Sequence, residues 1–190
     1  MKNKSLIIAI VLIAVAAISR LLPHPHNFSP VGSLAMFGGA VLASRYLKYL
    51  VPIIALFISD LVINNTLMRM YFPDHSGMII FQDYMIFTYV AFILAVVIGH
   101  VFIKKISIPS IIGGALGFTI VFFLISNFGS WISPISIYPK NFVGLIECYV
   151  AGVPFFKFSL AGNLLYSSII FGVYYLSING WKAVNFPQRA

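Results

Sequence analysis

Strongly polar side chains are few in this chain, and several of them interrupt or follow long apolar segments. Arg20 follows the apolar run from Leu6 to Ile18, and Asp60 lies inside an apolar stretch over residues 49–65. An ionisable group in such surroundings is costly to desolvate unless it is paired, so both are functional candidates. A charged pair here could contact a polar ligand at the rim of a cavity, or it could be a salt bridge between two helices. Arg20 could also extend along apolar surface to reach water.

The turn after Arg20 is rich in proline and polar residues, with the sequence Pro23-His-Pro-His-Asn-Phe-Ser-Pro30. Irregular backbone between apolar segments is tolerated in lipid only where protein or a water-filled cavity surrounds it. The turn therefore predicts a cavity, and a cavity suggests a ligand. Asn27 or Ser29 could cap the next helix, with Pro30 at its first position. The amides at that helix start could also face the cavity and bind an anionic or carbonyl group.

Further polar residues follow the later apolar segments. Asn64 lies one helical turn after Asp60, and Trp131 and Tyr138 could be interfacial aromatics or could stack on a flat ligand ring. The predicted substrate-binding residues are Arg20, Asn27, Asp60, Asn64, Asn127, Trp131, Tyr138, Glu147 and Asn163.

No metal site, cofactor or catalytic set is predicted. His24 and His26 are interpreted as loop residues, because two histidines without a fixed third ligand are weak grounds for metal binding. Cys148 is the single cysteine, so it cannot form an internal disulfide. It is interpreted as a small hydrophobic residue, or as a ligand for a soft metal centre if it faces a cavity. The sequence contains no G-x-x-x-x-G-K-[ST], G-x-S-x-G, H-E-x-x-H or C-x-x-C motif, so we predict that it is not an enzyme.

The composition is that of an integral membrane protein. The 190 residues are 61% hydrophobic and 8% charged, whereas soluble domains carry about 25% charged residues. The lipid bilayer is therefore the expected surrounding for most of the surface. The net charge of +8 does not predict nucleic-acid binding, because the basic residues are spread between apolar segments and are better explained by retention on the cytoplasmic face.

The elements that position these residues are six predicted membrane spans in one domain, residues 1–190. The spans cover about residues 5–22, 31–44, 49–65, 84–103, 108–126 and 156–178, with a short interfacial helix over 141–153. With both termini in the cytoplasm, eight Lys and Arg residues lie inside and four outside, as the positive-inside rule expects. Small residues at four-residue spacing (Ala35, Gly39 and Ala43; Gly113 and Gly117) could serve internal packing or the docking of a second membrane subunit.

Several motifs carry a family resemblance. After Arg20, the run Asn27-Phe-Ser-Pro-Val-Gly-Ser-Leu-Ala-Met-Phe-Gly-Gly-Ala40 resembles the signature of an uncharacterised bacterial membrane family that is related to the substrate-binding S components of energy-coupling-factor (ECF) transporters. Ile58-Ser-Asp-Leu-Val-Ile-Asn-Asn-Thr66, Asn127-Phe-Gly-Ser-Trp131, Tyr138-Pro-Lys140 and Cys148-Tyr149-x4-Pro154-Phe-Phe156 resemble its later motifs. The resemblance covers nearly the whole chain. It makes the first segment part of the fold, although Lys2, Lys4 and Ala14-Val-Ala16 could pass for a cleavable signal.

The resemblance implies an all-α integral membrane protein, a six-helix transmembrane bundle of the S-component type in the bacterial inner membrane. It would bind a vitamin or related micronutrient in an outward-facing pocket, and a membrane coupling protein with two ATPases would drive uptake. The first segment lacks the strict Ala-x-x-x-Ala motif that S components often carry. The alternative is a membrane scaffold or assembly protein without a small ligand. A cavity lined by Arg20, Asp60, Asn64 and Trp131 would favour transport, and solid packing of those side chains would favour a scaffold. The expected ligand is a flat, polar molecule, for which a zwitterion is one candidate, and a corrinoid is included if Cys148 faces the pocket.

Overall fold

The computed structural model describes residues 2–22, 25, 27–71 and 76–179. Within them the regular structure is helical and contains no strand, which confirms the predicted all-α class for the described residues. The helices are α1 (Lys2–Ser19), α2 (Val31–Val41), α3 (Leu47–Asn65), the short 3-10 helix η1 (Arg69–Tyr71), α4 (Asp83–Phe102), α5 (Ile108–Ile132) and α6 (Phe142–Asn179). Four of them, from α3 to α6 without η1, are long and apolar enough to cross a membrane, while α1 and α2 are shorter apolar helices.

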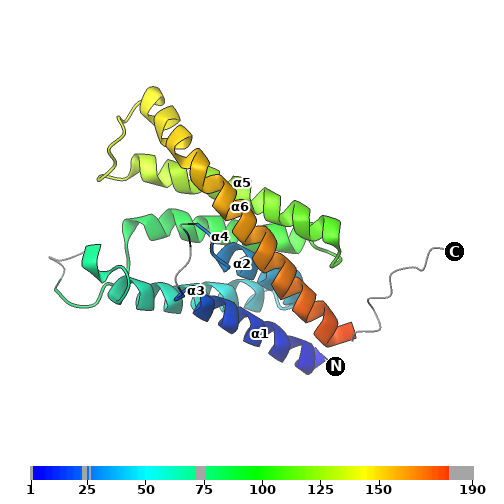
Figure 1. The fold of residues 1–190 in the computed structure, drawn as a ribbon. Coiled ribbons are helices and arrows are strands. Elements are labelled where there is room, and N and C mark those ends of the chain that lie inside the picture. Colours follow the sequence, from blue (N-terminus) through cyan, green and yellow to red (C-terminus); the bar gives the residue numbers. More distant parts are fainter. Residues whose placement is uncertain (1, 23–24, 26, 72–75, 180–190) are drawn as a thin grey trace.

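The helices alternate in direction, so the connections gather at two ends (Figure 1). We call the end that carries residues 66–71, 76–82 and 133–141 the loop end. The opposite end, where α1 begins and α6 ends, carries Arg45, Lys104 and Lys105, and we call it the lysine end.

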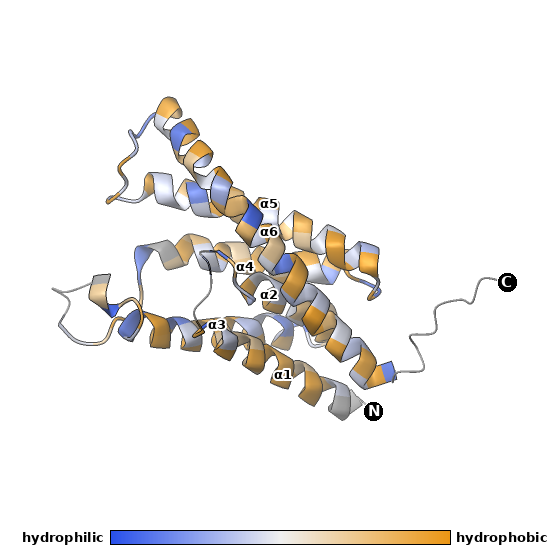
Figure 2. Ribbon diagram, in the orientation of Figure 1, coloured by the Kyte–Doolittle hydropathy of each residue, from blue (hydrophilic) through white to orange (hydrophobic). Residues whose placement is uncertain are grey.

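The surface is that of a protein in lipid. Helix α1 buries small residues such as Ala9, Ala16 and Ala17, while Ile7, Val15 and Ile18 on its other side are 61%, 57% and 64% exposed. Hydrophobic residues predominate along the helices, and hydrophilic ones lie near several helix ends and in the middle of α6 (Figure 2). Exposure of so many large apolar side chains marks a membrane-embedded surface.

Helix α2 lies at the centre of the bundle and contacts each of the five other α-helices. Residues Val31 to Gly39 are all buried, as expected for a helix that is apolar on every side. Its 11 residues rise only about 16 Å, which is about half of the hydrocarbon thickness of a bilayer. The second predicted span is therefore a short core helix that ends at Val41 rather than at residue 44.

Glycines let α2 and α4 approach each other at the backbone. A Cβ atom placed on Gly39 would collide with the backbone of Val96, and one placed on Gly99 would collide with the backbone of Met36. Ala35 is buried, whereas Ala43 is exposed beyond the end of α2. The first small-residue stripe therefore serves internal packing. At Gly113 and Gly117 an added Cβ would meet nothing within 4 Å, so the second stripe faces open space.

Two predicted elements at the end of the chain are wrong. Helix α5 continues to Ile132, and α6 is one helix of 38 residues from Phe142, so the predicted interfacial helix and sixth span are continuous. Pro154 lies inside α6, although a proline lacks the N–H of the helical hydrogen bond and usually ends or kinks a helix. Membrane helices tolerate such a proline because neighbouring groups compensate the lost backbone bond. The 38 residues extend about 57 Å, which exceeds the full thickness of a bilayer.

The start of α2 also differs from the capping expectation. Pro30 is the N-cap residue and no side chain caps this helix, so neither Asn27 nor Ser29 has that role. Asn27 has a φ of 62°, in the left-handed region that Asn tolerates better than most residues. The Ser29 hydroxyl is buried without a hydrogen-bond partner among the described residues.

Candidate functional site

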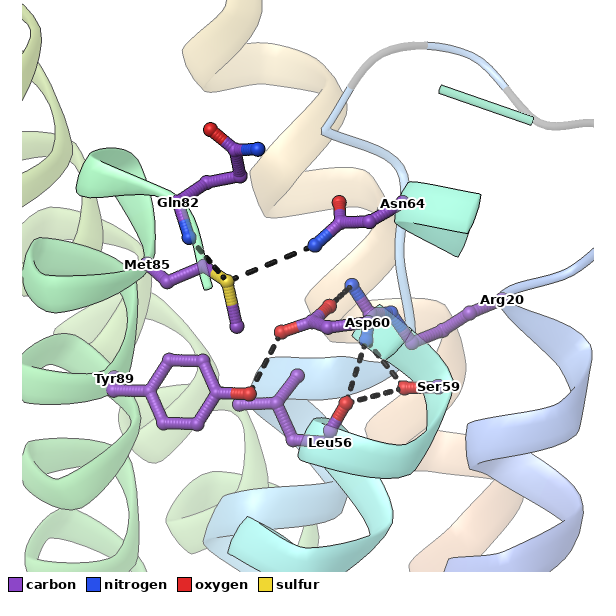
Figure 3. Close-up of polar contacts among 8 residues, drawn as sticks. All are labelled: Arg20, Leu56, Ser59, Asp60, Asn64, Gln82, Met85 and Tyr89. Carbon is purple, nitrogen blue, oxygen red and sulfur yellow. Dashed lines mark hydrogen bonds and ion pairs between the residues drawn. The ribbon is translucent and has the colours of Figure 1, made fainter. Parts of the chain in front are cut away.

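Arg20 and Asp60 form a buried ion pair that joins α1 to α3 (Figure 3). Arg20 Nη2 lies 2.7 Å from Asp60 Oδ1, and the two side chains are 15% and 5% exposed. Arg20 Nη1 also donates to the Ser59 hydroxyl and, at 3.5 Å, to the Leu56 carbonyl. The arginine therefore neutralises the carboxylate and satisfies backbone and side-chain acceptors of α3 together.

Helix α4 completes this cluster. The Tyr89 hydroxyl donates to Asp60 Oδ2 at 2.9 Å, so both carboxylate oxygens have partners. One turn further along α3, Asn64 Nδ2 lies 3.7 Å from Met85 Sδ, a weak acceptor, and Asn64 is fully buried. Figure 3 shows these side chains directed toward one another between α1, α3 and α4. Of the two sequence interpretations, the helix-to-helix salt bridge describes this geometry.

Asn163 lies in a second buried polar cluster, which joins α2, α5 and α6. Its Nδ2 donates to Thr119 Oγ1 at 3.0 Å, and its backbone carbonyl accepts from the Ser33 hydroxyl at 3.0 Å. Ser167 donates to Ser33 at 2.9 Å. These four polar residues are all buried. Because each hydroxyl and the amide have partners, the cluster satisfies itself and supports packing.

Two adjoining cavities lie at the loop end, beside the C-terminal half of α5. One, of about 390 Å³, lies between α5 and α6, and the other, of about 580 Å³, lies between α4, α5 and the loop after α5. Their volumes are typical of small-molecule sites. The two cavities share part of their lining, which consists of five residues: Asn27, Phe122, Ser126, Ser130 and Tyr138.

The shared wall presents unused hydrogen-bonding groups. Within the described part of the chain, no side-chain hydrogen bond to another residue is formed by Ser126, Ser130 or Tyr138. The side-chain amide of Asn27 also forms none. Phe122, Ser126 and Ser130 are four residues apart, so they lie on one face of α5. Aromatic rings flank them, including Phe155 and Phe156 of α6 and Phe87 of α4. The wall can therefore bind a flat molecule by stacking and hydrogen bonding.

The loop over residues 133–141 is held over these cavities by its own contacts. Trp131 Nε1 donates to the Pro139 carbonyl at 2.8 Å, and Lys140 Nζ donates to the carbonyls of Trp131 and, at 2.7 Å, of Ser133. Asn141 Oδ1 accepts from the Gly144 amide at the start of α6. Trp131 thus fixes the loop that carries Tyr138, and it does not line either cavity.

Asn127 and Cys148 connect α5 to α6 at the side of the smaller cavity. The Cys148 thiol lies 3.4 Å from the Asn127 carbonyl, and Asn127 Nδ2 donates to the Phe123 carbonyl at 2.8 Å. Both residues line the smaller cavity. Among the described residues no three His, Cys, Asp or Glu side chains come together to hold a metal ion.

The predicted site residues therefore divide into separate groups. Asn27, Asn127 and Tyr138 line the loop-end cavities, whereas Arg20, Asp60 and Asn64 form the first buried cluster and Asn163 belongs to the second. Glu147 is exposed and lines neither cavity. His24 and His26 lie outside the described residues, as do Asp74, Lys182 and Arg189.

Sequence reasoning missed several residues of both regions. Tyr89 of α4 was not predicted to join the ion pair, and its pattern, a tyrosine among apolar residues, gives no signal for that role. Ser126 and Ser130 were also missed. Their spacing of four, one turn after Phe122, is a signal that could have identified the cavity wall.

The fold and these clusters define a membrane-embedded helical protein. The chain belongs to a family of unknown function, DUF6580, which matches residues 1–186. No curated protein and no solved structure matches it.

Proposed function

We propose that this chain is a membrane-embedded substrate-binding subunit, similar to the S components of ECF transporters, that takes up a vitamin or related micronutrient. The observation that carries this proposal is the pair of loop-end cavities with free hydroxyl and amide groups on a shared aromatic wall. In this proposal the helical bundle is embedded in the bacterial inner membrane, both termini lie in the cytoplasm, and the loop end faces outward.

The ligand would enter from outside, beneath the loop that carries Tyr138. Binding would order Asn27 and this loop around the molecule, and release to the inside would need a coupling protein and ATPases in trans. Arg20 and Asp60 have no direct part in this proposal, because they are already satisfied by each other, Ser59 and Tyr89.

The charge of the cavity wall narrows the ligand class. Among the described residues that line the two cavities, Asp83 has a charged side chain, and there is no lysine or arginine. The nearby Lys140 is engaged by two backbone carbonyls. A ligand with unpaired negative charge would therefore lack a partner. We propose a flat, neutral or positively charged molecule, and not a corrinoid, which is far larger than either cavity.

Mass spectrometry of small molecules that co-purify with the protein in mild detergent tests this proposal. The variant Ser126→Trp fills the shared wall, and Ser177→Trp on the exposed surface of α6 is its matched control. We expect wild type and Ser177→Trp to retain the same molecule and Ser126→Trp to lose it. Absence of any bound small molecule, together with unchanged vitamin uptake in cells that carry Ser126→Trp, would contradict the proposal.

The scaffold function remains the second candidate because of one observation. Arg20, Asp60 and Asn64 pack against one another and against α4 instead of lining a cavity. A scaffold would retain a partner protein during purification and would carry no small molecule, so the same experiment separates the two functions.

A further inference from the structure

A third cavity lies at the lysine end, on the lipid-facing side of α5 and α6. It has a volume of about 360 Å³ and lies between the start of α5 and the last third of α6. We call it the lysine-end groove. Most of its wall is apolar, and it is formed chiefly by Ile108, Ile111, Ile112, Phe171, Gly172 and Tyr175.

The groove exists because α6 has a glycine where a side chain would fill it. A Cβ atom on Gly172 would meet no other atom within 4 Å. Ile108 and Ile112 at its rim are 75% and 49% exposed, and both helices are long enough to cross a membrane. An apolar groove on this surface is in contact with lipid, and a lipid acyl chain is chemically matched to its wall.

The mouth of the groove is positively charged. Lys104 and Lys105 are exposed and directly precede Ile106 and Ser107, which line the groove. Ser107 is also the N-cap residue of α5, so the positive end of the helix dipole lies at the same place. The Ser107 hydroxyl itself is engaged with Ser110 in the capping box, so the two lysines and the helix dipole are the features that favour a phosphate group here.

No described carboxylate offsets this charge. Asp83 lies in the first turn of α4 and Glu147 in the second turn of α6, both at the loop end, and Asp60 is paired with Arg20. The remaining acidic residue, Asp74, lies outside the described residues. The charge at the mouth therefore complements an anionic headgroup, whereas a zwitterionic headgroup would bring an additional positive charge to it.

We propose that the lysine-end groove binds an anionic phospholipid, with an acyl chain against Phe171 and Gly172 and the phosphate against Lys104 and Lys105 at the start of α5. This site is separate from the loop-end cavities and does not depend on the transport proposal.

Titration of the purified full-length protein with lipid tests this inference. We expect palmitoyl-oleoyl phosphatidylglycerol to raise the melting temperature and to bind in native mass spectra at least tenfold more tightly than the corresponding phosphatidylcholine. Glycerol phosphate, the soluble headgroup, is expected to have no effect at the same concentration. Equal binding of the two lipids would overturn the proposal. So would a rise in melting temperature with glycerol phosphate that equals the rise with phosphatidylglycerol.

Two variants locate the site. Lys104→Gln combined with Lys105→Gln should weaken phosphatidylglycerol binding about thirtyfold, or roughly fivefold for each lysine, while Lys157→Gln on the exposed surface of α6 should not. Gly172→Leu should exclude the acyl chain, and Gly113→Leu, at an equally open glycine outside the groove, should not. Preference for phosphatidylglycerol that survives both changes would place the lipid elsewhere and overturn the assignment.

Discussion

Asp60 is a carboxylate that is almost completely removed from solvent and remains satisfied. Its two oxygens accept from Arg20 and Tyr89, on two different helices. Helices in lipid gain little from apolar contact with each other, so polar bonds contribute a larger share of their association. At its other end, α1 is joined to α6 by a hydrogen bond between Ser5 and Tyr174.

The change Asp60→Asn tests this structural role. It leaves the Arg20 guanidinium buried without its counter-ion, so we expect the free energy of unfolding in detergent to fall by about 3–5 kcal/mol. Tyr89→Phe removes one hydrogen bond to the carboxylate and should cost about 1.5–3 kcal/mol. Denaturant titration followed by circular dichroism measures both. Glu147→Gln, at an exposed carboxylate, is the control and should change stability by less than about 0.5 kcal/mol. If the Asp60→Asn variant were as stable as the wild type, this would contradict a structural role for the ion pair between Arg20 and Asp60.

At the scale of elements, the crossing of α2 and α4 depends on two glycines. Gly39→Val would place a side chain inside the backbone of Val96, and we expect a loss of about 3 kcal/mol or more because a packed backbone cannot move away. Gly117→Val is the matched control, since an added Cβ there meets no atom within 4 Å. It should change stability by less than about 1 kcal/mol. Equal melting temperatures of the two variants would contradict the close crossing.

The loop over residues 133–141 is the second element that can be tested. Lys140→Met removes the two bonds to the carbonyls of Trp131 and Ser133. We expect faster amide hydrogen exchange in this loop and, because Tyr138 is then less fixed, weaker binding of the co-purified ligand by about tenfold. Global stability should change little. Lys157→Met is the control, and loop exchange that is the same in both variants would show that the lysine does not hold the loop.

The sequence predicts some of these elements well and others poorly, for physical reasons. Arg20 and Asp60 each follow or interrupt an apolar run, so their pairing could be predicted as one of two alternatives. The length of α6 could not be predicted in this way. A proline in the position of Pro154 usually ends a helix in soluble proteins, and whether a membrane helix tolerates it depends on the neighbouring helices. The role of Trp131 depends on the position of the Pro139 carbonyl, which lies in an irregular loop. The amino-acid pattern around Trp131 therefore does not predict its hydrogen bond to the Pro139 carbonyl.

At the scale of the whole molecule, polar groups are separated between the two ends. The lysine end carries Arg45, Lys104 and Lys105, while Asp83 and Glu147 lie at the loop end together with the ligand-sized cavities. Positively charged loops are retained in the cytoplasm during insertion. The lysine end should therefore face inward, which would direct the cavities toward the outside and the lysine-end groove toward the inner leaflet.

Cysteine labelling in intact cells tests this orientation. Cys148 is the native cysteine and is buried, so Cys148→Ser provides a background that retains a hydroxyl near the Asn127 carbonyl. In this background we expect Ser136→Cys, in the loop after α5, to react with a membrane-impermeant maleimide applied from the periplasm. Lys104→Cys, in the loop before α5, should react only after the inner membrane is permeabilised. The reverse pattern would show that the lysine end faces outward, and the loop-end cavities could then not receive a ligand from outside the cell.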